Sequence, residues 1–294
     1  MNGSYLITGG TGSFGRAFLK RLISKNKKIK RIVIFSRDEL KQSELQNLYP
    51  KSKFPFLRFF LGDVRDFERL KSAMIGVDVV IHAAALKQVP STEYNPFEAV
   101  KTNILGAQNV INSCFENTVK KVIALSTDKA CAPINLYGAT KLCSDKLFIS
   151  ANNIKGKKDI KFSVVRYGNV FGSRGSVYGT FKNFQNKGYF PITNSNMTRF
   201  NITLDQGIDV VLYAINSSFG GEIIVPKLKS FKIIDLAKAI EKKCKLKIIG
   251  IRPGEKIHEQ MISKSDSYYT LEMKKFYVIL NNDNKQLKNY YKNK

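Results

Sequence analysis

The segment 9–15, which reads GGTGSFG, constrains the fold of this chain more than any other stretch. It follows the short apolar run SYLIT, and apolar residues recur with helical spacing after it, from Arg16 onward. Strand, glycine turn and helix in this order form a dinucleotide-binding unit, because small residues let the backbone approach a pyrophosphate and the first helical turn offers unpaired N–H groups. Glycine-rich turns also occur for purely geometric reasons, so the position between a strand and a helix carries this prediction.

The end of the second apolar strand, 30–35, indicates which dinucleotide is bound. The residues that follow it are Ser36, Arg37, Asp38 and Glu39. An acidic side chain here would accept hydrogen bonds from the ribose of NAD, whereas serine and arginine suit the additional phosphate of NADP, because a guanidinium group binds phosphate bidentately. The sequence therefore favours NADP, with NAD as the less favoured alternative in which Asp38 or Glu39 holds a ribose.

Further apolar runs alternate with helical patterns along the first part of the chain. A long helix is expected near 96–116, and the apolar runs lie at 57–61, 77–81, 121–126 and 161–167. This alternation without long insertions predicts an α/β fold of the Rossmann type, a doubly wound parallel sheet, with a smaller C-terminal lobe that binds substrate. The predicted divisions are an NADP-binding domain with the catalytic residues at 1–168, a mainly substrate-binding lobe at 169–280 and a weakly ordered tail at 281–294.

Charge and hydropathy argue against two classes of partner. The 294 residues carry a formal net charge of +26, but the lysines are spread along the chain without a basic stripe interleaved with aromatic residues, so no nucleic-acid partner is expected. No apolar run approaches the roughly 18 to 20 residues that span a bilayer, and the chain begins directly with a strand. We therefore expect no membrane association, no signal peptide and a cytoplasmic location.

Cysteine and histidine argue against metal and disulfide chemistry. The chain has only two histidines, so metal cages and Ser/His/Asp triads lack their commonest component. We expect no metal and interpret His82, at the end of the fourth strand, as a buried structural residue. The cysteines show no CxxC spacing and are expected to be free thiols at Cys114, Cys131, Cys143 and Cys244.

The stretch 124–146, ALSTDKACAPINLYGATKLCSDK, contains the candidate chemistry. Tyr137 and Lys141 are four residues apart, which places both on one face of a helix. A strand that ends at Thr127 would present Asp128 and Lys129 across a cleft from that face. We interpret this arrangement as a proton-handling site, and the alternative is a solvent-facing Asp/Lys pair at a strand end.

A set of motifs from about residue 4 to about residue 280 resembles the extended short-chain dehydrogenase/reductase superfamily. Its general marks are YxxxK and GxxGxxG. Within it, the sequence is similar to the inverting UDP-N-acetylglucosamine 4,6-dehydratases of pseudaminic acid and related surface-glycan pathways, for which SRDELKQSE and STDKA are the more particular motifs. The other matching segments read FFLGDVRD, HAAALKQVP, EYNP, RYGNVFGSRGS, MTRF and IRPGEK.

The resemblance implies an NADP-dependent hydro-lyase that converts UDP-N-acetylglucosamine to a 4-keto-6-deoxy sugar nucleotide with inversion at C5. By similarity, Tyr137 takes the proton of the 4-hydroxyl while hydride leaves C4, Lys141 holds the cofactor ribose and Thr127 hydrogen-bonds the 4-oxygen. Lys129 removes the C5 proton, and Asp128 protonates the departing 6-hydroxyl. Retaining 4,6-dehydratases carry glutamate in place of the lysine, so Lys129 carries the prediction of inversion.

The chemistry of these side chains sets two conditions. A free tyrosine has a pKa of about 10, so activity near neutrality needs a shift of roughly three units, about 4 kcal/mol. Lys141 and the oxidised nicotinamide are cations placed to favour the tyrosinate. Lys129 must be neutral to act as a base, and because an ionised Asp128 would oppose this, Asp128 is expected to be protonated.

The remaining site residues follow from the motifs and the resemblance. Cofactor-binding residues are predicted to be Gly9, Thr11, Gly12, Ser13, Phe14, Gly15, Ser36, Arg37, Asp38, Glu39, Lys41, Asp63, Val64, Ala83, Ala84, Ala85, Thr102, Tyr137, Lys141, Asn169 and Val170. The resemblance implies that the UDP-sugar substrate is bound by Lys87, Thr127, Tyr137, Asn169, Arg199, Arg252 and Glu255. It also implies a homo-oligomer, either a hexamer or a dimer.

Two alternative functions use the same residues. A nucleotide-sugar epimerase needs only small changes, since C5 deprotonation without loss of water, or C4 oxidation with return of hydride to the other face, would use the same site. A non-catalytic cofactor-binding subunit is the second alternative, and the complete catalytic set argues against it. It is motivated by the altered substrate-side loop at Tyr178, Gly179 and Thr180. The chain also departs from the group's pattern at Gln88, where histidine is usual, and at Asn201, where tryptophan is usual.

Overall fold

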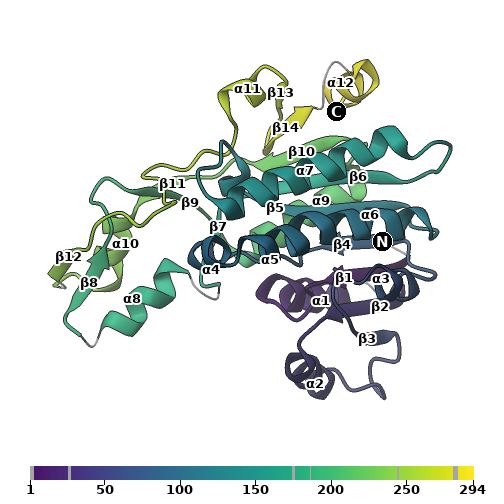
Figure 1. Cartoon of the computed structure of the whole chain (residues 1–294), viewed down its shortest axis with the longest axis horizontal. Coiled ribbons are helices and arrows are strands. Elements are labelled where there is room, and N and C mark those ends of the chain that lie inside the picture. Colours follow the sequence, from purple (N-terminus) through teal and green to yellow (C-terminus); the bar gives the residue numbers. More distant parts are fainter. Residues whose placement is uncertain (1–2, 26–27, 174–175, 186, 244, 281–283) are drawn as a thin grey trace.

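The computed structural model describes residues 3–25, 28–173, 176–185, 187–243, 245–280 and 284–294. Its centre is a sheet of nine strands within these ranges. The strands are β1 (Gly3–Thr8), β2 (Ile29–Ser36), β3 (Leu57–Leu61), β4 (Val79–His82), β5 (Lys121–Thr127), β6 (Lys161–Tyr167), β10 (Glu222–Pro226), β13 (Thr270–Glu272) and β14 (Phe276–Leu280). Their order is β13-β14-β10-β6-β5-β4-β1-β2-β3 (Figure 1).

The strands from β3 to β10 run parallel, and only the β14 and β13 edge is antiparallel. The order 3-2-1-4-5-6 is that of a doubly wound dinucleotide-binding sheet, so the predicted fold class is confirmed. Every residue of β1 is buried, because both neighbouring positions are occupied by strands and both faces are covered.

Helices cover both faces of this sheet (Figure 1). One face carries α3 (Phe67–Ala73), α6 (Gly106–Phe115) and α7 (Leu136–Ile154), and the other carries α1 (Ser13–Lys25) and α9 (Leu204–Ser217). The helix α2 (Glu39–Leu48) lies beside β3. Each face has its own apolar cluster, one containing Phe148 and Phe162 and the other containing Phe18 and Ile208.

The long helix predicted near 96–116 is not continuous. It consists of α5 (Pro96–Val100), a π-helical turn (Lys101–Leu105) and α6, with the short helix α4 (Val89–Tyr94) before it. The π turn points buried Thr102 and Asn103 inward, and the Asn103 amide bonds the backbone N and O of Leu86 at 2.8 Å each. The turn thereby fixes the loop that follows β4, a common use of π turns at functional sites.

The smaller lobe lies at one end of the molecule, beyond β7 (Figure 1). Its first elements are β7 (Asn169–Val170), α8 (Val177–Gln185) and β8 (Tyr189–Ile192). Its core centres on Phe181, Phe190 and Ile233. The remaining elements of the lobe are β9 (Thr198–Ile202), β11 (Ser230–Lys232), α10 (Ile233–Ile240) and β12 (Lys245–Ile248).

The division at residue 168 does not separate the sheet from the lobe. After the first lobe elements the chain returns to the central sheet, where α9 covers β5 and β6 and where β10, β13 and β14 extend the edge. Within the predicted tail, residues 281–283 lie outside the described residues and 285–292 form α12 (Lys285–Lys292), which follows the short α11 (Lys264–Ser267) and β14. The buried side chains of Leu287 and Tyr291 hold α12 in place, because Tyr291 Oη donates to buried Glu222 at 3.1 Å.

Three of the four cysteines, Cys114, Cys131 and Cys143, carry free thiols, and Cys244 lies outside the described residues. Among the residues that the structure describes, no group of histidine, cysteine and acidic side chains could hold a metal ion. In the same part of the chain, no helix combines the length and apolarity needed to cross a membrane.

Candidate active site

A cavity of about 780 Å³ lies where the carboxyl ends of β1, β2, β4, β5 and β6 meet the smaller lobe. Strand order reverses between β1 and β4, and ligands bind at such a crevice in doubly wound sheets. The predicted site residues line this cavity, with two exceptions. Glu39 is exposed on α2, and Asp128 is fully buried behind the wall.

The glycine turn has the shape that a pyrophosphate requires. Gly9 has φ +65°, and a Cβ there would lie 2.9 Å from the backbone N of Ala84. A Cβ on Gly15 would overlap the carbonyl oxygen of Gly10. Because α1 begins at Ser13, the N–H groups of its first turn face the same space. The cradle and the helix terminus therefore fit a dinucleotide.

The end of β2 and the start of α2 line the same cavity as the glycine turn. Asp38 is the N-cap of α2, where its carboxylate accepts from Lys41 N at 2.9 Å and pairs with the Lys41 ammonium. Arg37 is exposed, and its Nη1 lies 3.4 Å from Asp63 Oδ2. The carboxylate of Asp38 is thus engaged by capping, whereas cationic groups of Arg37 and Lys41 border the space.

Tyr137 and Lys141 lie in the first turns of α7, both buried and both on the cavity wall. Asn135 caps the helix, since its Oδ1 accepts from Gly138 N at 2.7 Å and its Nδ2 donates to Gly254 O at 2.7 Å. Burial raises the pKa of Tyr137, the hydrogen bond between its side chain and Thr127 opposes this, and the charges of Asp128 and Asp145 add to the rise. The tyrosinate is therefore not favoured by the protein alone.

A buried ionic network acts on the charge of Lys141. Burial lowers the pKa of Lys141, and the charge of Asp145 opposes that change. Asp145 in turn accepts from Ser126 Oγ at 2.6 Å and lies 3.4 Å from Arg166 Nη2. The network links the last residues of β5 and β6 to the helix that carries Tyr137.

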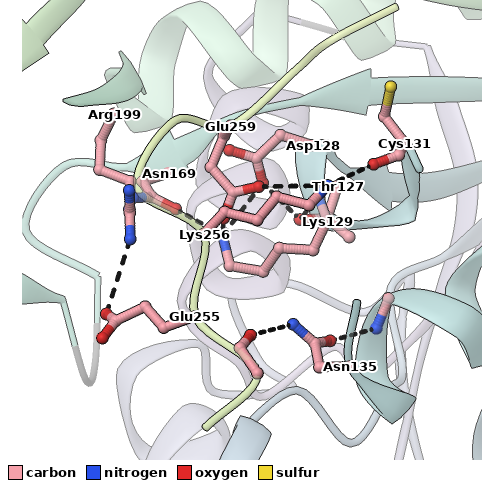
Figure 2. A network of polar contacts seen from close by, with 12 residues as sticks. Thr127, Asp128, Lys129, Cys131, Asn135, Asn169, Arg199, Glu255, Lys256 and Glu259 are labelled. Atoms are coloured by element: carbon pink, nitrogen blue, oxygen red, sulfur yellow. Dashed lines mark hydrogen bonds and ion pairs between the residues drawn. The ribbon is translucent and has the colours of Figure 1, made fainter. Parts of the chain in front are cut away.

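The turn after β5 carries the second part of the candidate chemistry. Thr127 ends the strand, and Asp128 and Lys129 lie in a 3₁₀ turn (Asp128–Ala130). Asp128 Oδ1 accepts from Thr127 Oγ1 at 2.9 Å and from Lys129 Nζ at 3.1 Å. The Lys129 amine also donates to Asn169 Oδ1 at 3.2 Å, which places it on the cavity wall (Figure 2).

Gly138 sets the distance between α7 and this turn. A Cβ at this position would overlap the carbonyl oxygen of Lys129 and lie 3.0 Å from its carbonyl carbon. Since both are backbone atoms, the turn would have to move. The glycine of YGATK therefore brings the two halves of the site together.

We predict that Gly138→Ala lowers kcat by about 10²-fold, because displacements near 1 Å cost this much when a reacting group is misplaced. Cofactor affinity should change much less, since the glycine turn is distant in sequence and intact. Steady-state kinetics and cofactor titration measure both quantities. Gly207→Ala is the matched control, since its Cβ would meet no atom nearer than 4.0 Å. Equal kcat values for the two variants would contradict the argument.

Two residues beside Lys129 carried no predicted role, and only Glu259 lines the cavity. Glu259 is buried, faces the cavity, and its Oε1 lies 3.4 Å from Lys129 Nζ. Lys256 Nζ lies 4.0 Å from Glu259 Oε2 and donates to Cys131 O at 2.7 Å. Figure 2 shows these side chains gathered around Lys129. Lys256 is the last residue of the IRPGEK motif and Glu259 lies three residues beyond it, but the motif gives no indication that Glu259 is buried.

Three residues predicted to bind the UDP group form ion pairs with one another. Glu255 lies 2.9 Å from Arg252 Nη2 and 3.6 Å from Arg199 Nη2. Burial acts to raise the pKa of Glu255, but the two guanidinium groups outweigh it and hold that pKa below its usual range. Lys87 and Asn169 lie on the same cavity wall. The arrangement offers cations for phosphates and a carboxylate for ribose hydroxyls.

His82 is a buried structural residue in this structure, as its position at a strand end indicates. It is 1% exposed, and its Nδ1 lies 2.9 Å from Thr8 Oγ1. Burial, together with the charge of Lys141, lowers the pKa of His82 from 6.5 to about 3. The unfolded chain therefore binds a proton below pH 6.5 that the folded chain does not bind, and stability falls as the pH decreases from 6.5 toward 3.

We predict that this histidine removes about 2 kcal/mol of the free energy of unfolding between pH 7 and pH 5. Chemical denaturation at the two pH values measures the loss. His82→Gln should give a smaller loss, whatever its stability at pH 7. The control His258→Gln changes the other histidine, which is exposed. The same loss in His82→Gln and the wild type would contradict the prediction.

Comparison with known proteins decides the family. The sequence profile described as polysaccharide biosynthesis protein matches residues 5–281. The chain belongs to this family. It is 58% identical over 276 residues to the inverting UDP-N-acetylglucosamine 4,6-dehydratase of Campylobacter jejuni, which covers 93% of this chain and 81% of that protein. The resemblance inferred from the motifs is therefore confirmed.

Other proteins that are similar to this chain are named for a different activity or by a short name only. The UDP-glucose 4-epimerase of Rickettsia bellii is 45% identical over 282 residues, covering 93% of this chain and 82% of that protein. The X-ray structure of Pen from Bacillus thuringiensis is similar with a TM-score of 0.90 at 37% identity, covering 96% of this chain and 89% of that one. Proteins named as dehydratases and as epimerases are thus both similar to this chain. The fold does not separate the two activities, so the side chains of the site have to be compared with the chemistry of each.

Proposed function

We propose that this chain is a hydro-lyase that uses NADP to convert UDP-N-acetylglucosamine to UDP-2-acetamido-2,6-dideoxy-4-keto-hexose with inversion at C5. The observation that carries the proposal is the Lys129 amine, which lies on the same cavity wall as Tyr137 and contacts Asp128 and Asn169. The identity with the C. jejuni dehydratase supports it. The cytoplasmic location, the homo-oligomer and the pseudaminic acid pathway stay predictions.

The side chains divide the reaction into two proton transfers. Tyr137 takes the proton of the 4-hydroxyl, with Thr127 as hydrogen-bond partner. Bound NADP would supply the hydride acceptor for C4 and the hydride donor for C6, and its positive nicotinamide would favour the tyrosinate that burial disfavours. Lys129 then removes the C5 proton, which is acidified by the neighbouring ketone.

The departing 6-hydroxyl needs a proton donor, for which the sequence indicates Asp128. In the structure Asp128 is fully buried and is linked to the cavity wall by hydrogen bonds from Lys129 and Thr127, of which only the Lys129 amine is a proposed base. The donated proton therefore passes along the hydrogen bond from Lys129, with the Lys129 amine as the group that faces the sugar. The Asp128 and Lys129 pair gains one proton from C5 and gives one to the 6-oxygen, so its net charge is the same after dehydration as before.

An epimerase that oxidises and reduces C4 needs Tyr137 but no base at C5. The Asp128 and Lys129 pair has no role in that reaction, and for this reason dehydration is the better supported function. Incubation with NADP and UDP-N-acetylglucosamine, followed by mass spectrometry, tests the choice. A product lighter by one water supports the proposal, a product of unchanged mass supports epimerisation, and an unconverted substrate supports a non-catalytic subunit.

The choice of NADP rests on the end of β2. Asp38 is engaged in capping α2, while Arg37 and Lys41 border the cavity at this end of β2. Arg37→Ala should weaken NADP binding about tenfold to 100-fold and NAD binding little, because hydrogen bonds to charged groups contribute about 1.5–3 kcal/mol. Calorimetric titration with both cofactors measures this, and Arg58→Ala on β3 is the control. An equal loss for NAD and NADP would contradict the assignment.

A further inference from the structure

The Lys129 amine lies between two buried carboxylates. Its Nζ is 3.1 Å from Asp128 Oδ1 and 3.4 Å from Glu259 Oε1, and it donates to Asn169 (Figure 2). The Asp128 side chain is fully buried and that of Glu259 is 4% exposed. Two negative charges therefore lie within ion-pair distance of one ammonium group and attract it. A base at this position must nevertheless become neutral, so some other group has to offset this attraction.

Lys256 is placed to provide that offset. Its Nζ lies 4.0 Å from Glu259 Oε2 and is held by a hydrogen bond of 2.7 Å to Cys131 O, directly after the turn that carries Lys129. Its side chain is only 14% exposed, so solvent screens its charge little. With Lys256 included, the formal charges of the two carboxylates and the two ammonium groups sum to zero. The contacts around Lys129 can then fix its position without leaving an excess of negative charge beside it.

We propose that Glu259 is a positioning residue that holds Lys129 Nζ at the cavity wall, and that Lys256 balances the Glu259 carboxylate so that Lys129 can pass a proton to Asp128. This inference rests on the proposed function. The transfer breaks one N–H bond and forms one O–H bond along the existing contact, and the total charge does not change. It leaves a neutral amine to take the C5 proton and a carboxylic acid that returns a proton, through the Lys129 amine, to the 6-oxygen as water leaves.

A purely structural role makes a different prediction. If Glu259 and Lys256 only fasten the segment after Arg252 to the 3₁₀ turn, their loss should change stability and substrate KM, with kcat little affected. A role in the charge balance of Lys129 affects the dehydration step itself. It should leave the formation of reduced nicotinamide, which depends on Tyr137, in place.

The experiment measures kcat, KM and hydrogen–deuterium exchange at C5 in the full chain with NADP and UDP-N-acetylglucosamine. Lys256→Met should lower kcat and C5 exchange about tenfold, because the unbalanced Glu259 carboxylate then keeps Lys129 charged. The double variant Lys256→Met with Glu259→Gln should recover most of this loss. Glu259→Ala should be less active than Glu259→Gln, which keeps an oxygen acceptor for Nζ. Lys227→Met is the control, since Lys227 forms a similar pair with Glu272 on the surface.

The outcomes separate this inference from the proposed function. If the wild type makes no dehydrated product, the proposed function fails. If the wild type dehydrates and Lys256→Met matches it, or if the double variant is no better than Lys256→Met, the charge-balance role is wrong. Equal activity of Glu259→Ala and Glu259→Gln would overturn the positioning role. Reduced nicotinamide formed on substrate addition shows, in the same sample, that each variant is folded and binds both ligands.

Discussion

Lys129→Ala is expected to lower the rate of dehydration by about 10²–10⁴-fold, the range that general bases contribute. The amine faces the cavity and contacts Asp128, Asn169 and Glu259, so its removal takes away the base without disturbing the cofactor side. Reduced nicotinamide should still form when substrate is added, because C4 oxidation depends on Tyr137. Absorbance of the reduced cofactor and the mass of the product measure the two steps separately.

The control for this variant is Lys146→Ala, which removes an exposed lysine from the same stretch of sequence. It should retain the activity of the wild type. Full dehydration by Lys129→Ala would contradict the assignment of the base. Loss of both steps in Lys129→Ala would mean that the residue supports cofactor or substrate binding instead.

Tyr137→Phe is expected to abolish both steps, with a loss of about 10²–10⁴-fold in each. Without the phenol, the 4-hydroxyl keeps its proton, no ketone forms at C4, and the C5 proton is not acidified. The fold should be retained, because the phenyl ring keeps its buried position. NADP binding should also be little changed.

This variant also tests the pH dependence of the reaction. Because burial raises the pKa of Tyr137, the neutral phenol predominates near neutrality and the wild-type rate should increase with pH. The residual rate of Tyr137→Phe should lack this increase. A wild-type rate that falls as the pH rises from 7 to 9, or reduced nicotinamide formed at the normal rate by Tyr137→Phe, would contradict the role of the tyrosine.

The sequence pattern was sufficient to predict those parts of the fold that depend on residues close together in the chain. The glycine turn, the apolar strands and the spacing of Tyr137 and Lys141 predicted a doubly wound sheet and one wall of its cavity. The π-helical turn could not be predicted from local pattern. It depends on the hydrogen bonds between Asn103 and the backbone of Leu86, and on the close packing of Gly106 against Val64. The return of β10 and β14 to the sheet likewise depends on pairing between distant segments.

The candidate site shows the same limit. The sequence predicted that Asp128 and Lys129 face a cleft, but the tight 3₁₀ turn directs Asp128 into the interior and only Lys129 to the cavity. Glu259 and Lys256 follow a loop without periodic pattern, so nothing local indicates that they are buried. Their positions arise because Asn135 binds Gly254 and Lys256 binds Cys131, contacts across more than a hundred residues of sequence.

The central claim is that Lys129 makes this chain an inverting dehydratase. The most direct measurement is the reaction of the full chain with NADP and UDP-N-acetylglucosamine in deuterated water, with the product identified by mass and by NMR at C5. The account predicts a 4-keto-6-deoxy product that has lost one water, carries deuterium at C5 and has the inverted C5 configuration. A product with retained C5 configuration, or one that has the mass of the substrate, would contradict it.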